Sequence, residues 1–114
     1  MKKLCFLLLA FSFALTLQFC SSAKKSVAAI PKVTYMGNIA PLVQSSCAPC
    51  HFPPKGNKKP YDTYVRVKSD IDEILVRIQK NPDEKGFMPM RHPKLSDSTI
   101  NVIRQWKADG LLEM

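Results

Sequence analysis

Cys47-Ala48-Pro49-Cys50-His51 forms a C-x-x-C-H motif near the middle of this 114-residue chain. Two thiols three residues apart can each form a thioether with a different vinyl group of one haem, and the next residue then lies under the iron. An imidazole at that position can bind the iron on its proximal side. The spacing therefore predicts one covalently attached haem c, held by Cys47 and Cys50, with His51 as an axial ligand.

Three other kinds of site use a similar motif. A structural zinc ion needs four ligands, and after these three only His92 remains as a strong candidate. A redox dithiol of the thioredoxin type belongs in a βαβ context, which the helical pattern of this chain does not provide. A disulfide between Cys47 and Cys50 would leave His51 without a role and would add little to a domain that lacks other bridges.

The residues on either side of the motif are typical of a helix and a loop. Asn38 offers an N-cap for a short helix that runs toward Ser46, and Pro41 falls in the first turn, where a missing N–H costs nothing. Residues 52–60 contain three prolines and a glycine, which indicates a loop. The haem motif is therefore expected at the end of a helix.

A further helix is predicted after that loop. Asp62, and then Ser69 or Asp70, offer N-caps, and the helix is expected to end near Lys80. Its apolar stripe consists of Ile71, Ile74, Leu75 and Ile78. This spacing predicts a helix that packs one face on the core.

The last predicted helix follows a second loop at residues 81–93. Ser96 offers its N-cap and Gly110 ends it. Trp106 lies on the apolar face with Ile100 and Ile103 and is expected to be buried. Because the chain shows no internal repeat and no alternating strand pattern, we expect an all-α fold.

Residues Tyr35 to Leu111 resemble the class I monohaem cytochromes c, in particular the small bacterial periplasmic forms. The resemblance rests on the short helix that enters the haem motif, on the Phe87-Met88-Pro89-Met90 loop, and on the closing helix. It implies a small cytochrome c-like helical domain wrapped around one covalent haem. In that family the methionine before the proline ligates the iron opposite the histidine, and Met88 is the matching residue here.

Two neighbours of Met88 remain open as alternative distal ligands. Met90 would bind if the loop adopted a different register, and His92 would give a bis-histidine site. A Met/His pair raises the reduction potential relative to two imidazoles. Met88 also fits the role of an apolar gap-filler against the haem face.

The first residues have the layout of a secretory signal. A positive start at residues 1–3 precedes an apolar-rich run at 4–19, and small residues follow at 21–23. The sixteen residues of the run fall short of the about 20 that span a bilayer. We therefore expect a signal peptide at 1–23, a linker at 24–34 and one cytochrome c domain at 35–114, located in the periplasm or cell envelope.

Cys20 opens a second mode of anchorage. Leu17-Gln18-Phe19-Cys20 resembles a bacterial lipoprotein box, although such a box has a small residue where this chain has Phe19. Lipidation of Cys20 would tether the protein to a membrane, whereas cleavage after Ala23 would discard that cysteine. Both modes stay open.

The charge of the exported part is basic. Beyond Ala23 there are fifteen Lys and Arg against nine Asp and Glu, a net charge near +6. Export, and the lack of a basic stripe interleaved with aromatic residues, argue against nucleic acid as a partner. Six cations flank the segments expected to meet the haem, which favours redox partner proteins with acidic patches: Lys55, Lys58, Lys59, Lys85, Arg91 and Lys94.

These features predict a carrier of single electrons between redox partners outside the cytoplasm, and not an enzyme. One alternative is a haem-based enzyme or sensor whose distal iron position is open or displaceable. Another is a metal or dithiol module without haem. Because a chain of this size builds only a small core, the domain is expected to be largely disordered without haem.

Overall fold

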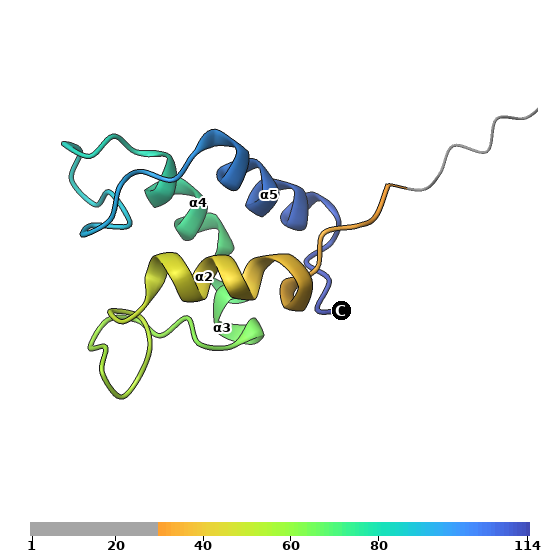
Figure 1. Cartoon of the computed structure of the whole chain (residues 1–114), viewed down its shortest axis with the longest axis horizontal. Coiled ribbons are helices and arrows are strands. Elements are labelled where there is room, and N and C mark those ends of the chain that lie inside the picture. The colour runs from red at the N-terminus through yellow and green to blue at the C-terminus, as the bar shows by residue number, and fades with distance from the viewer. Residues whose placement is uncertain (1–29) are drawn as a thin grey trace, which may run out of the picture. The chain divides into compact units, whose positions relative to one another are not determined.

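The computed structural model describes residues 30–114, and this part of the chain contains helices and no strand (Figure 1). The predicted all-α class is therefore confirmed for the described residues. The predictions for the signal peptide, for Cys20 and for the linker up to residue 29 lie outside them. No helix within residues 30–114 is long and apolar enough to cross a bilayer.

The first helical segment begins one turn earlier than predicted. A single π-helical turn, η2 (Tyr35–Ile39), continues directly into α2 (Ala40–Cys47). Thr34 is the N-cap, because its hydroxyl accepts a hydrogen bond from the Gly37 amide at 3.2 Å. The predicted cap at Asn38 is wrong: this residue lies inside the turn, and its side-chain oxygen accepts from the Thr34 amide at 3.0 Å.

Pro41 lies in the first turn of α2, as predicted. Because η2 precedes it, Pro41 lies inside a continuous helical segment, where its missing N–H removes one donor to the carbonyls of the preceding turn. The helix ends at Cys47, so the first thiol is on the last helical residue and the second is in the turn that follows.

The next part of the chain forms two short helices, α3 (Tyr64–Ser69) and α4 (Ile71–Gln79). The predicted N-cap at Asp62 is wrong, because the hydroxyl of Thr63 caps α3 by accepting from the Arg66 amide at 3.4 Å. Asp62 instead pairs with the Arg66 guanidinium. The predicted start of the next helix at Asp70 is confirmed, and Lys80 follows its last residue.

The last helix, α5 (Asp97–Ala108), matches its prediction closely. The Ser96 hydroxyl accepts from the Thr99 amide at 3.2 Å, which confirms the N-cap. Gly110 follows the helix with a φ of +95°, a left-handed conformation that glycine adopts without steric cost. Trp106 is completely buried, as its position in the apolar stripe predicted.

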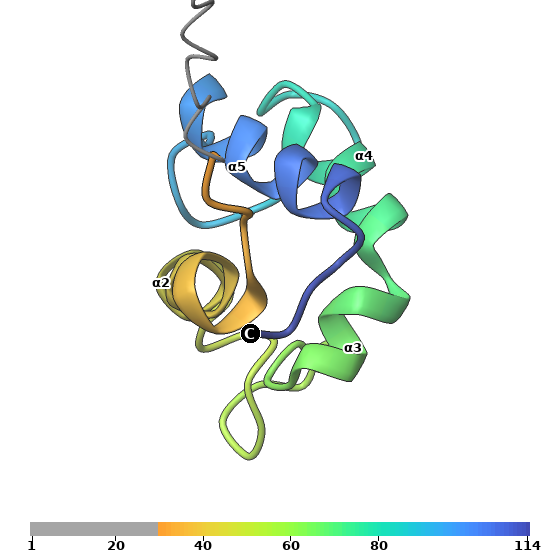
Figure 2. The same cartoon turned by 90° about the vertical axis from the view of Figure 1, so that its right-hand side faces the viewer.

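The core lies between these helices, and α5 packs against both η2 and α4 (Figures 1 and 2). Three aromatic rings meet in it: Tyr35 and Tyr64 stand edge-to-face at 5.5 Å, and Trp106 lies 5.9 Å from Tyr35. The C-terminal segment covers this cluster, because the Leu112 carbonyl accepts from the Trp106 indole and from the Tyr35 amide, both at 2.8 Å. The aromatic cluster is therefore closed off by the last residues of the chain.

Replacement of Trp106 by phenylalanine is expected to destabilise the protein by about 1–3 kcal/mol, because it removes the indole hydrogen bond and leaves a void in a close-packed core. Urea unfolding followed by far-ultraviolet circular dichroism measures this change. Tyr64→Phe is the matched control, since it removes the hydroxyl's two hydrogen bonds, one to the Leu111 carbonyl and one from Lys68 Nζ, and almost no volume. A Trp106→Phe protein no less stable than Tyr64→Phe would contradict the assignment of Trp106 to the core.

Candidate functional site

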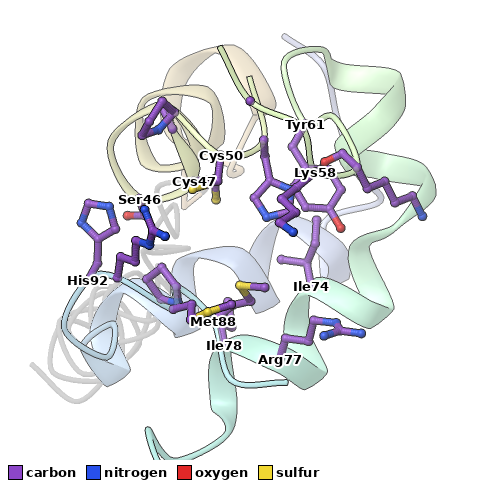
Figure 3. A pocket seen from close by; sticks show the side chains of 18 of the residues that line it. Ser46, Cys47, Cys50, Lys58, Tyr61, Ile74, Arg77, Ile78, Met88 and His92 are labelled. Atoms are coloured by element: carbon purple, nitrogen blue, oxygen red, sulfur yellow. The ribbon is translucent and has the colours of Figure 1, made fainter. Parts of the chain in front are cut away.

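A cavity of about 790 Å³ opens among α2, α4 and the two long loops. The loop after α2 and the loop after α4 lie at the same end of the unit, opposite the C-terminus (Figure 1). The cavity lining includes all the residues that the sequence proposed as ligands: Cys47, Cys50, His51, Met88, Met90 and His92. Figure 3 shows Cys47 and Cys50 on one side and Met88 on the opposite side.

The two thiols are free and half-buried. Burial raises the pKa of the Cys47 thiol to about 11. A redox dithiol works in the opposite way, because its attacking cysteine needs a lowered pKa to be a thiolate near neutral pH. Cys47 therefore lacks the lowered pKa that marks the attacking cysteine of a redox dithiol.

The imidazole of His51 is fixed in one orientation. Its Nδ1 lies 2.6 Å from the Lys59 carbonyl oxygen, and a carbonyl can only accept a hydrogen bond, so Nδ1 carries the proton. In the neutral ring the unprotonated nitrogen is then Nε2, which has a lone pair for a metal. The ring also stacks on Tyr61, with centroids 4.6 Å apart and planes 13° from parallel.

The loop after the motif folds back tightly on it, and Gly56 makes this possible. The Gly56 amide donates to the Phe52 carbonyl at 2.9 Å, and the Lys58 amide donates to the Cys50 carbonyl at 3.1 Å. A Cβ at position 56 would lie far inside van der Waals contact with the carbonyl oxygens of Pro49 and Cys50. Only glycine allows this approach, since the obstructing atoms are backbone.

Gly56→Ala is expected to displace this loop and to destabilise the protein by about 1–3 kcal/mol, the usual cost of overpacking. Because the same loop carries the Lys59 carbonyl, the hydrogen bond to His51 should weaken as well. Urea unfolding measures the change in stability. Asn57→Ala, a change at an exposed neighbour in the same loop, is the control, and equal stabilities of the two variants would contradict the expectation.

Met88 is anchored to the end of α4. Its amide donates to the Arg77 carbonyl at 3.3 Å. The Arg77 guanidinium bonds Glu73 at 2.6 Å and reaches the Gly86 carbonyl at 3.5 Å. Gly86 itself has a φ of +86°, which turns the chain at this point. Met88 is thereby held half-buried against the core, with its side chain toward the cavity (Figure 3).

The two alternative distal residues lie in different surroundings. Met90 is 68% exposed, and His92 is also exposed, at the edge of the cavity in Figure 3. A ligand that must exclude water from a buried iron is better placed when its own side chain is already packed, as Met88 is.

A polar cluster at the start of α4 was not predicted. Asp70 accepts a hydrogen bond from the Tyr61 hydroxyl and one from Lys59 Nζ at 2.5 Å. Partial burial acts to raise the pKa of the Asp70 carboxyl, but these two hydrogen bonds outweigh it and the pKa lies below its ordinary value. Burial, and then the bond to Asp70, raise the pKa of the Tyr61 hydroxyl. The sequence marked Asp70 only as a helix cap, so nothing in it signalled this pairing.

Within residues 30–114, no three His, Cys, Asp or Glu side chains are grouped as ligands for a metal ion. Comparison of the chain with protein-family models, with curated proteins and with solved structures finds no match.

Proposed function

We propose that this protein is an exported monohaem c-type cytochrome that transfers single electrons between redox partners outside the cytoplasm. The observation that carries the proposal is the meeting of Cys47, Cys50, His51 and Met88 around one cavity. These residues come from two segments about 40 positions apart, and the sequence motif alone does not require them to face each other.

The residues present fit a haem. A volume of about 790 Å³ is within the range of cofactor sites, roughly 300–1,000 Å³. Both thiols line the cavity unpaired, and His51 is held with Nε2 available. A bound haem supplies a one-electron couple of its iron, and the protein tunes the potential of that couple.

Each residue has a separate task in this proposal. Cys47 and Cys50 hold the group covalently, and His51 ligates through Nε2. Met88 offers a soft thioether that favours ferrous iron and so a higher potential. Ile74 and the buried Ile78, which line the same cavity, keep water away from it.

Cations on the cavity lining fit the proposed acidic partners. Lys55, Lys58 and Arg91 are exposed and line the cavity. An acidic surface on a redox partner would be drawn toward this face, and the attraction would weaken in salt because charges are screened over about 10 Å at 0.1 M.

The test is an absorption spectrum of the full chain, purified from the cell envelope of a host with an intact haem-ligation system. We expect the reduced spectrum of a c-type haem and colour that stays with the polypeptide in acidified organic solvent. The weak sulfur-to-iron band of the oxidised state should also be present. Colourless, iron-free protein would refute the proposal and favour the module without haem.

Two further outcomes of this experiment separate the remaining alternatives. Covalent haem without the sulfur band would favour an enzyme or sensor with an open distal position. The intact mass of the same sample shows whether the chain begins after residue 23 or at a lipidated Cys20, because a lipid adds mass beyond that of haem.

A further inference from the structure

A single carboxylate holds both neighbours of the His51 ring. The ring donates through Nδ1 to the Lys59 carbonyl at 2.6 Å, and it stacks on Tyr61 at 4.6 Å. One oxygen of Asp70 accepts from Lys59 Nζ at 2.5 Å, and the other accepts from the Tyr61 hydroxyl. Asp70 therefore touches both residues that touch His51, without being among the ring's own contacts.

The position of Asp70 in its helix shows that the carboxylate is committed to these two partners. Asp70 occupies the N-cap of α4, where an aspartate usually accepts a hydrogen bond from a first-turn amide. Its side chain makes no such bond. The side chain is only 13% exposed, so water competes little for its oxygens.

The backbone adds a third connection between the same segments. The Tyr61 amide donates to the His51 carbonyl at 2.9 Å, which fixes the Tyr61 main chain beside the motif. The orientation of the phenol ring then depends on its hydroxyl, whose partner is Asp70. The position of the Lys59 carbonyl depends in part on its ammonium group, whose partner is again Asp70.

We propose that Asp70 is a positioning residue that fixes the plane of the His51 imidazole through Lys59 and Tyr61. This inference rests on the proposed function, in which His51 ligates a haem iron. An acceptor such as the Lys59 carbonyl orients a ligating histidine and makes it more basic by accepting its second ring proton. Asp70 would act one step further out, by holding Lys59 and Tyr61 in place. Loss of the carboxylate should let the ring turn and should loosen the bond from Nδ1 to the Lys59 carbonyl.

The test compares haem-bearing Asp70→Asn with the wild type by proton magnetic resonance. In the oxidised protein the shifts of the haem methyl groups report the plane of the axial imidazole, and we expect their pattern to change. In the reduced protein we expect the His51 Nδ1 proton to exchange with solvent about tenfold faster, the factor that corresponds to loss of one modest hydrogen bond. Neither readout depends on electron-transfer activity.

Asp72→Asn is the matched control. It removes the same charge from the same helix, but Asp72 is 77% exposed and pairs with Lys107 instead of lining the cavity. Its methyl shifts and proton exchange should equal those of the wild type. If Asp72→Asn changed the methyl shifts and the proton exchange as much as Asp70→Asn does, loss of a negative charge alone would explain both results. That outcome would overturn the inference.

Tyr61→Phe is a second, uncharged test, because it keeps the stacked ring and removes only the hydroxyl. It should alter the methyl shifts in the same sense but less, and Asp70→Asn combined with Tyr61→Phe should equal Asp70→Asn alone. Wild-type signals in Tyr61→Phe overturn the inference even if Asp70→Asn fails to accumulate. Haem-bearing variants with unchanged signals refute only this inference, whereas a wild-type protein without haem refutes the proposed function and the inference with it.

Discussion

A chain in which Cys47 and Cys50 are both replaced by alanine is expected to lose covalent haem completely and most of its helical structure with it. The C-terminal end of α2 and one face of α4 line the cavity of about 790 Å³, so in the proposed holoprotein the haem is a large part of what this end of the unit packs against. A purely proteinaceous core in a domain of this size supplies roughly 3–5 kcal/mol. Removal of the group should therefore leave too little burial to offset the entropy of ordering the chain.

Far-ultraviolet circular dichroism of the purified double variant measures the remaining helix. Gln44→Ala with Ser45→Ala is the matched control, because both residues are exposed on α2 and neither lines the cavity. That control should keep both colour and helices. Native helix content in the double cysteine variant would show that the aromatic cluster around Trp106 sustains the fold without the haem.

The sequence predicted most of the fold because the signals were local. Ser96 caps the start of α5 and Gly110 follows its end, as their capping preferences predicted. Trp106 is buried, as its position in the helical repeat of apolar residues predicted. Two predicted caps were wrong, each for its own reason. Thr63 stands next to Asp62 and caps α3 in its place, and single-residue preferences do not rank two adjacent candidates, whereas Thr34 lies one turn before Asn38, so the first helical segment was predicted too short.

The candidate site was predicted less completely. The motif at residues 47–51 could be interpreted directly, since its chemistry is set by short spacing. The contacts among Lys59, Tyr61 and Asp70 depend on how the loop after the motif folds back, which no periodicity encodes. Gly56 was taken only as a sign of a loop, although it is also the residue that lets the backbone close on Cys50.

Met88→Leu is expected to abolish the sulfur-to-iron band of the oxidised protein and to lower its reduction potential. Leucine has nearly the size and apolar character of methionine, so the half-buried packing against the core should survive while the thioether is lost. Without a soft ligand the ferric state is favoured, and the potential should fall on the order of 0.1 V or more, within the about 0.8 V range that axial ligands set. Potentiometric titration followed by absorbance measures the shift.

Met90→Leu and His92→Gln are the controls that separate the three candidate ligands. Met90 is 68% exposed and His92 is exposed, so neither change should alter the band or the potential if Met88 binds the iron. Loss of the band in Met90→Leu, with the band retained in Met88→Leu, would show that Met90 is the distal ligand. A rise of the potential in His92→Gln would instead indicate a bis-histidine site, because exchange of imidazole for a weaker donor raises the potential. We expect the Met88 variant to differ from the other two because the Met88 amide donates to the Arg77 carbonyl at the end of α4. This hydrogen bond holds the Met88 backbone beside the cavity.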